Sequence, residues 1–133
     1  MRLSEAEARR RLTDARVVRL ATVDATGVPH LVPATFAVRD EEILIAVDHK
    51  PKRHQNLRRL RNVAENPQVC VLADHYADEW TQLWWVRADG IGHVSDDAPI
   101  DPLVAKYPQY REHPPDGPVL TIHVNRWTGW TYT

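Results

Sequence analysis

Short β-branched segments separated by turn residues are the feature of this 133-residue sequence that most limits its fold. The first two segments are residues 17–23 and 28–38, joined by Asp24-Ala25-Thr26-Gly27, in which glycine supplies the turn of a hairpin. A second turn, Arg39-Asp40-Glu41, leads into a strand at residues 42–47. Strands of this length joined by turns this short predict an antiparallel sheet.

The rest of the chain continues this pattern, with a few helical segments. Further strands are predicted at residues 68–73, 80–88, 91–95 and 119–132, the middle two forming a hairpin across Asp89-Gly90. Helices are predicted at 4–12, 52–64 and 101–107, the first with a capping box of Ser4 and Glu7. Loops are predicted at 74–78 and at the proline-rich segment 108–118. Six or seven short strands with two or three small helices predict a mainly β fold, an antiparallel barrel rather than a sandwich.

Length and composition predict one domain over residues 1–133. The hydrophobic content of 43% and charged content of 26% are ordinary for a soluble globular protein. No apolar run approaches the roughly 20 residues of a membrane span, and the charged N-terminus lacks the apolar region of a signal peptide. Cys70 is the only cysteine, so an internal disulfide is impossible. We expect a cytoplasmic protein that does not bind membranes.

A basic run at residues 49–61 stands out in a protein whose formal net charge is only -1. It holds six Lys or Arg residues in thirteen positions and no acidic residue: Lys50, Lys52, Arg53, Arg58, Arg59 and Arg61. The run spans a predicted strand-to-helix turn, with Pro51 suited to the first helical turn. Backbone N–H groups and the positive end of the helix dipole are available there for an anion.

Two other interpretations of the basic run remain open at this point. It is equally compatible with a solvated basic face of a helix, because charge runs often have no ligand. Nucleic-acid binding is less favoured, since the run is short, the remaining chain is acidic and no nucleic-acid motif accompanies it.

Five tryptophans fall within the last two long predicted strands, where Trp84 and Trp85 are adjacent. Adjacent strand residues point to opposite faces, so both cannot enter one small barrel core. We favour one of them at a subunit interface or against a flat ligand. The alternative is that one fills the core and the other is partly exposed.

The segment Gly27-Val28-Pro29-His30-Leu31-Val32-Pro33-Ala34-Thr35-Phe36 contains two prolines four residues apart. Proline removes a donor from the strand ladder, so this strand is predicted to lie near an edge or to be bulged. The small residues at 33–35 would allow a planar ligand to approach the backbone. An irregular edge strand without a ligand is the alternative.

Catalytic motifs give little information. There is no dinucleotide fingerprint, phosphate-binding P-loop or nucleophile elbow. The seven histidines lack metal-ligand spacing apart from His49 and His54, so no metal site is predicted. No catalytic residue can be assigned. His75 and Tyr76 are the polar candidates for a proton donor, with a surface role as the alternative.

The order of these segments along the chain resembles that of a known protein family. The carrying residues are Arg19-Leu20-Ala21-Thr22-Val23-Asp24, Gly27-Val28-Pro29-His30, Val32-Pro33-Ala34-Thr35-Phe36, Ala46-Val47-Asp48-His49-Lys50-Pro51-Lys52-Arg53, Leu57-Arg58-Arg59-Leu60, Asn66-Pro67-Gln68-Val69-Cys70-Val71-Leu72, Asp74-His75-Tyr76 and Leu83-Trp84-Trp85-Val86-Arg87-Ala88-Asp89-Gly90. Over residues 4–132 this order resembles the pyridoxamine-phosphate-oxidase-like (PPOX-class) split β-barrel proteins. It is most similar to their branch that uses coenzyme F-420, a deazaflavin with a phosphate and a polyglutamate tail (flavin/deazaflavin oxidoreductase type B).

The resemblance implies a homodimer with cofactor sites at the subunit interface. Lys50, Lys52 and Arg53 match phosphate-binding positions, Val32 to Thr35 match the strand along the deazaflavin ring, and His75 to Trp84 match a segment contributed by the partner subunit. The surplus arginines would suit the anionic tail. The implied cofactor contacts are Val32, Pro33, Ala34, Thr35, Lys50, Lys52, Arg53, Asn56, Arg58, His75, Tyr76, Trp80 and Trp84.

The function implied by the resemblance is hydride transfer between F-420 and a small, conjugated organic substrate. Since the cofactor carries the chemistry, the protein needs no triad or metal of its own. Two alternatives stay open: an enzyme that uses flavin mononucleotide (FMN) on the same fold, and a non-catalytic protein that binds F-420 or a flavin.

Overall fold

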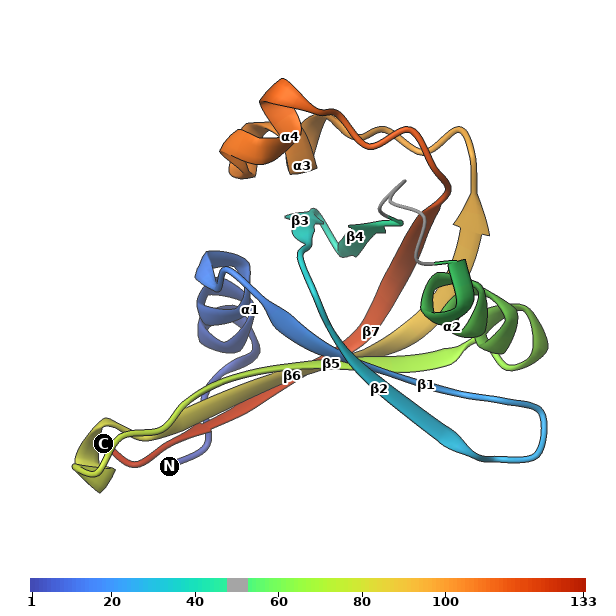
Figure 1. Ribbon diagram of the computed structural model, residues 1–133. Coiled ribbons are helices and arrows are strands. Elements are labelled where there is room, and N and C mark those ends of the chain that lie inside the picture. The colour runs from blue at the N-terminus through green and yellow to red at the C-terminus, as the bar shows by residue number, and fades with distance from the viewer. Residues whose placement is uncertain (48–52) are drawn as a thin grey trace.

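The computed structural model describes residues 1–47 and 53–133, and the side chains of these residues except 53–57. Within these residues seven antiparallel strands form one curled sheet in the order β2-β1-β5-β6-β7-β4-β3 (Figure 1). The strands are β1 Val18–Val23, β2 Pro29–Ala34, β3 Ala37–Arg39, β4 Glu42–Ala46, β5 Gln68–His75, β6 Trp84–Ser95 and β7 Val119–Thr131. The helices are α1 Glu5–Asp14, α2 Arg53–Glu65, α3 Asp101–Lys106, α4 Pro108–Glu112 and the single turn η1 Trp80–Gln82. The predicted mainly β, antiparallel fold is confirmed.

The segment predicted as one strand over residues 28–38 is divided into two. β2 lies at one end of the strand order and β3 at the other, so the chain crosses between the two edges at Thr35 and Phe36. The Phe36 side chain is fully buried, and its backbone N–H donates to the Tyr107 hydroxyl at 3.0 Å. Tertiary contacts therefore break a segment that looks continuous in sequence.

The predicted hairpin across Asp89-Gly90 is wrong. β6 runs without interruption from Trp84 to Ser95 and pairs along its whole length with β7. A register shift at Asp89/Gly90 leaves Asn125 of β7 as an extra residue, which is a β-bulge. Glycine is needed in β6 because a Cβ at position 90 would overlap the His123 carbonyl oxygen. The glycine marks close strand contact, not a turn.

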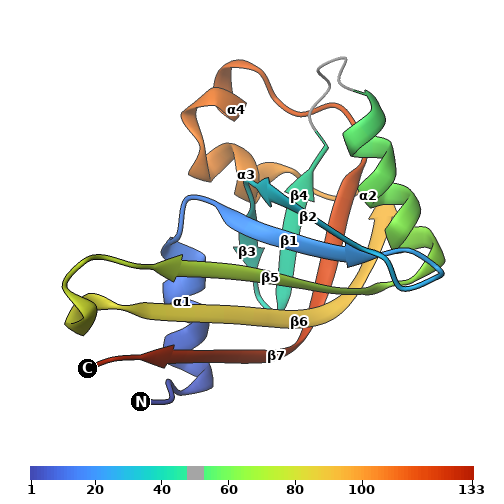
Figure 2. The same ribbon diagram turned by 60° about the horizontal axis from the view of Figure 1, so that its bottom comes forward.

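α1 packs against the inner face of β6 and β7, beside the two chain ends (Figure 2). Ser4 caps the helix by accepting a hydrogen bond from the Glu7 backbone N–H at 3.1 Å, as the sequence predicts. Ala8 and Leu12 are fully buried against the main core. The helix predicted at residues 101–107 is present as α3, and α4 occupies part of the predicted proline-rich loop.

A second, smaller core lies between α3 and the β3–β4 end of the sheet and includes Leu44, Leu103 and Tyr107. Lys106 lies at its border, where its Nζ donates to the Thr13 carbonyl oxygen at 3.1 Å and lies 3.6 Å from the Phe36 ring centroid. Burial, and then the charge of Arg16, lower the pKa of Lys106 from 10.5 to about 8, against the opposing effect of Asp14.

This shift predicts the pH dependence of stability. Between pH 8 and 10.5 the unfolded chain keeps the Lys106 proton that the folded chain has lost, so the free energy of unfolding rises with pH. We expect the wild type to gain stability in urea titrations between pH 8 and 9.5, below tyrosine titration, and Lys106→Met to gain less. An identical gain in both proteins would contradict the assignment to Lys106.

No helix among the described residues is long and apolar enough to cross a membrane.

Candidate functional site

β2 forms one edge of the sheet and pairs only with β1, from Val18 opposite Ala34 to Val23 opposite Pro29. This confirms the edge position predicted from the two prolines. Side chains alternate along the strand, so Val32 and Ala34 pack on the main core while Pro33 is exposed on the other face. Of the four residues expected along the cofactor ring, the strand therefore presents two inward and one outward, with Thr35 just beyond its end.

α2 lies beside the hairpin of β1 and β2. Asn62 Nδ2 donates to Thr22 Oγ1 at 3.0 Å in a buried contact, and the Ala25 N–H donates to Glu65 Oε1 at 3.2 Å. These bonds fix the C-terminal half of α2 against β1 and the turn that follows it, and Arg58 and Arg59 lie close enough to His30 to act on its pKa. The predicted helix at 52–64 is confirmed within one residue at each end.

His30, opposite Thr22 on β2, lies where α2 and β2 meet. Burial, and then the charges of Arg58 and Arg59, lower the pKa of His30 and so favour its neutral form. Its Nε2 is buried and has no hydrogen-bond partner among the described residues. This end of β2 thus combines two cations with a neutral ring nitrogen, which is an environment suited to an anionic group.

The other end of β2 carries hydroxyl groups. Thr35 Oγ1 and the Tyr110 hydroxyl of α4 are 2.8 Å apart, and the Tyr107 hydroxyl holds the neighbouring backbone of Phe36. Thr35 is a predicted contact residue, whereas Tyr110 lies in the segment predicted as a proline-rich loop. No local sequence signal links Tyr110 to a residue 75 positions away.

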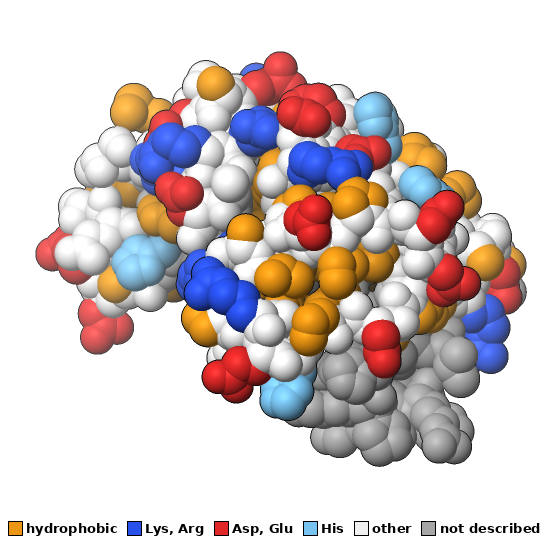
Figure 3. Space-filling model, turned by 90° about the horizontal axis from the view of Figure 1, so that it is seen from above, with side chains coloured by type: hydrophobic (Ala, Val, Ile, Leu, Met, Phe, Trp, Pro, Cys, Tyr) orange, Lys and Arg blue, Asp and Glu red, His pale blue; other side chains and the backbone are white. Residues whose placement is uncertain are grey.

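Several predicted site residues cannot be placed. Lys50 and Lys52 lie outside the described residues, and so do the side chains of Arg53 and Asn56, although Arg53 begins α2. Arg58 is described and lies near His30. On the face seen in Figure 3, the described Lys and Arg side chains are interspersed with Asp and Glu and do not form a continuous basic surface.

The predicted site residues from His75 to Trp84 lie in a different part of the fold from β2 and α2. Trp84 faces inward on β6 with its ring centroid 6.3 Å from that of His75. Tyr76 and Trp80 are exposed, and Trp80 is the first residue of η1. The connection between β5 and β6 that contains them lies at the other end of the sheet from α2 (Figure 1). β1 and β5 separate β2 from β6, a distance of about 14 Å at the usual strand spacing. One chain therefore does not bring this group to the inner face of β2.

Trp84 and Trp85 point to opposite faces, as predicted. Trp84 packs on the main core, and Trp85 faces outward beside Trp130 and Arg87.

Among residues 1–47 and 53–133, no three His, Cys, Asp or Glu side chains are grouped so that they could hold a metal ion.

A curated enzyme is similar in sequence to part of this chain. The 5a,11a-dehydrotetracycline/5a,11a-dehydrooxytetracycline reductase of Streptomyces rimosus is 39% identical over 56 residues, which are 42% of this chain and 38% of that protein. The match thus spans well under half the length of this curated relative.

Solved structures confirm the fold. An FAD-binding protein from Mesorhizobium loti has a TM-score of 0.69 at 21% identity, over 97% of this chain and 95% of that one. An FAD-binding protein from Mycobacterium smegmatis has a TM-score of 0.65 at 22% identity, over 98% of both chains. The family model described as pyridoxamine 5'-phosphate oxidase matches residues 4–131. This chain therefore belongs to the pyridoxamine 5'-phosphate oxidase family.

Proposed function

We propose that this protein is an F-420-dependent reductase of the pyridoxamine 5'-phosphate oxidase family that acts on a small conjugated substrate. The observation that carries the proposal is the position of α2, whose arginines lie against the His30 end of the edge strand β2. Membership of a family described as an oxidase and local similarity to a reductase support an oxidoreductase.

The residues of β2 fit a deazaflavin or flavin. From His30 to Thr35 the strand extends about 17 Å at the usual rise per residue, with cations at one end and the Thr35–Tyr110 hydroxyl pair at the other. His30 Nε2 is buried without a hydrogen-bond partner among the described residues, so a small shift of the ring would let it bond to a phosphate or ribityl hydroxyl. Val32, which is only partly buried, offers apolar surface for a ring between these ends.

The bound deazaflavin would supply hydride transfer, and the tasks of the chain are then binding, orientation and proton supply. Arg58 and Arg59 hold the anionic end, and β2 orients the ring. The Thr35 and Tyr110 hydroxyls, 2.8 Å apart, are two described groups able to hold a proton at the far end of the ring from His30. His75 and Tyr76 remain candidates only if a second chain contributes them.

We further propose a homodimer in which the His75–Trp84 segment of each subunit reaches the β2 site of the other. In its favour, Trp84 on β6 lies about 14 Å and two strands from β2 within one chain, and His75 on β5 lies about 10 Å and one strand away. The outward, half-buried pair Trp85 and Trp130 on β6 and β7 suits an interface, where Trp is enriched. A cytoplasmic location, a small-molecule substrate and the lack of nucleic-acid or membrane partners remain predictions.

FMN on the same site is the second candidate for the cofactor. The FAD-binding proteins with this fold favour a flavin-type ligand in general. FMN has one phosphate to be bound, which does not account for several arginines on α2. F-420 also has a longer anionic tail, to which the additional arginines could bind. A non-catalytic cofactor-binding protein is the third possibility and would bind F-420 without turnover of any substrate.

Removing the charge of Arg58 tests the site. We expect Arg58→Gln to weaken F-420 binding about tenfold, since a charge-assisted contact is lost, and to weaken FMN binding less. Tryptophan fluorescence titration measures both affinities. Arg126→Gln is the matched control, because Arg126 is an exposed arginine on β7 away from β2 and α2. Equal F-420 affinities for wild type and Arg58→Gln would contradict the proposed position of the anionic end.

A further inference from the structure

A surface cavity of about 390 Å³ lies at the C-terminal end of α1, away from the cations of α2. Its lining is Arg10, Arg11, Asp14, Ala15 and Trp84. The volume is in the usual range of small-molecule sites. Of the lining residues, only Trp84 is among the contacts expected from the sequence.

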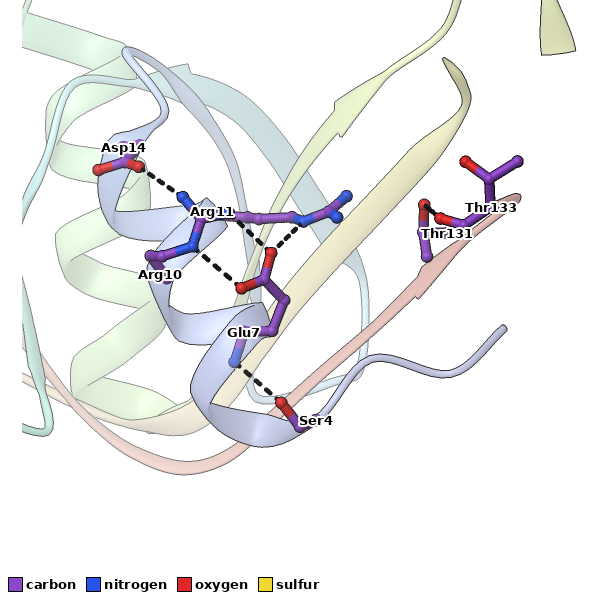
Figure 4. A network of polar contacts seen from close by, with 7 residues as sticks. All are labelled: Ser4, Glu7, Arg10, Arg11, Asp14, Thr131 and Thr133. Atoms are coloured by element: carbon purple, nitrogen blue, oxygen red, sulfur yellow. Dashed lines mark hydrogen bonds and ion pairs between the residues drawn. The ribbon is translucent and has the colours of Figure 1, made fainter. Parts of the chain in front are cut away.

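Arg11 is held rigidly beside this cavity. Its Nε donates to Glu7 Oε2 at 2.8 Å, its guanidinium carbon lies 5.5 Å from the Trp84 ring centroid, and its side chain is only 23% exposed. Figure 4 shows the guanidinium extending past Glu7, away from Arg10 and Asp14 and toward the ends of β6 and β7. Its two terminal nitrogens have no hydrogen-bond partner among the described residues.

The acidic groups nearby are already committed to other partners. Glu7 receives Arg10 Nε at 3.0 Å and Arg10 Nη2 at 2.7 Å in addition to Arg11 Nε. These contacts lower the pKa of Glu7 to about 2, so it stays ionised. Asp14, the carboxylate in the lining, accepts from Arg10 Nη1 at 3.2 Å. The terminal nitrogens of Arg11 therefore form a fork left open for a carboxylate-like ligand.

The aromatic side of the cavity fits a flat molecule. Trp84 and His75 are cross-strand partners with ring planes inclined by 25°, and Arg11 lies over the Trp84 ring. Planar anions such as conjugated carboxylates or enolates combine the ring surface and the charge that these residues recognise.

We propose that Arg11 and Trp84 bind the acidic group of a planar, conjugated anion, which is the substrate class of this protein. The link to a substrate rests on the proposed reductase function, whereas binding of the anion itself does not.

The test uses 2-naphthoate as the probe and its neutral counterpart 2-naphthamide, without cofactor, followed by isothermal titration calorimetry on the full chain. We expect naphthoate to bind the wild-type protein. Naphthamide should bind wild type at least about tenfold more weakly, and naphthoate should bind Arg11→Gln at least about tenfold more weakly. Arg11→Lys keeps the charge but cannot donate two parallel hydrogen bonds, so its affinity for naphthoate should lie between those of wild type and Arg11→Gln. Arg126→Gln, with an exposed arginine on β7, should bind as wild type does.

The inference is overturned if Arg11→Gln binds naphthoate as wild type does, if naphthamide binds equally well, or if wild type does not bind naphthoate. Thermal unfolding of each variant establishes that the chain is folded. If Arg11→Gln does not fold, the naphthoate affinity of Arg11→Lys tests the inference instead. F-420 titration of the same samples separates the two proposals. Naphthoate binding without F-420 binding would refute the reductase and leave the anion site, and the reverse would refute the anion site alone.

Discussion

Gly90→Ala is expected to lower the free energy of unfolding by about 3 kcal/mol, because an added Cβ has no room between β6 and β7. That Cβ would overlap the His123 carbonyl oxygen and lie 3.0 Å from both the His123 carbonyl carbon and Ile122 Cγ2. Two of these three atoms belong to the backbone of the central strand pair, so relief requires β7 to move. Equilibrium urea unfolding measures the loss.

Gly27→Ala is the matched control for the loss of a glycine. A Cβ at position 27 would meet nothing within 4 Å, and the cost there is the positive φ of 89°. We expect a loss of about 1 kcal/mol, from backbone conformation alone. Equal losses at both positions would show that contact with β7 is not what requires Gly90.

Tyr107→Phe is expected to cost about 2–3 kcal/mol of stability, since it removes a buried hydroxyl that serves the crossing between the sheet edges. This hydroxyl accepts from the Phe36 N–H at 3.0 Å and lies 2.9 Å from the Phe36 and Arg16 carbonyl oxygens, to one of which it donates. Phe36 lies outside both strand ladders, so its backbone groups cannot turn to a strand neighbour.

Tyr110→Phe serves as the comparison, because it removes a hydroxyl from the same small helical region. The Tyr110 hydroxyl contacts only the part-buried Thr35 Oγ1 among the described residues, so the expected loss is about 1 kcal/mol. Thermal or urea unfolding of both variants gives the two values. A Tyr107→Phe protein as stable as Tyr110→Phe would contradict the role assigned to the buried hydroxyl.

Features set by neighbouring residues could be predicted from the sequence. The Ser4 cap, the turn at Gly27, the position of α2 and the edge position of β2 each follow from a few adjacent residues. Asp89-Gly90 shows the limit of such signals. The same dipeptide serves a hairpin turn or a bulge, and the choice depends on how closely β7 approaches.

The site was less predictable, because its residues meet only in the folded chain. The basic run and the small residues of β2 were recognised as separate features, and α2 brings them together at His30. Tyr110 contacts Thr35, and Arg11 contacts Trp84, across separations of 75 and 73 positions. Such pairs leave no trace in local periodicity or charge pattern. Alternation along β2 also sends the predicted contact residue Pro33 to the opposite face from Val32 and Ala34.

The central claim is that the residues of β2 and α2 bind F-420 in preference to FMN. The most direct measurement is a side-by-side tryptophan fluorescence titration of the wild-type protein with the two cofactors at one ionic strength. The account predicts the lower dissociation constant for F-420, with the difference shrinking as added salt screens the arginines of α2. Tighter binding of FMN, or no binding of F-420, would contradict it.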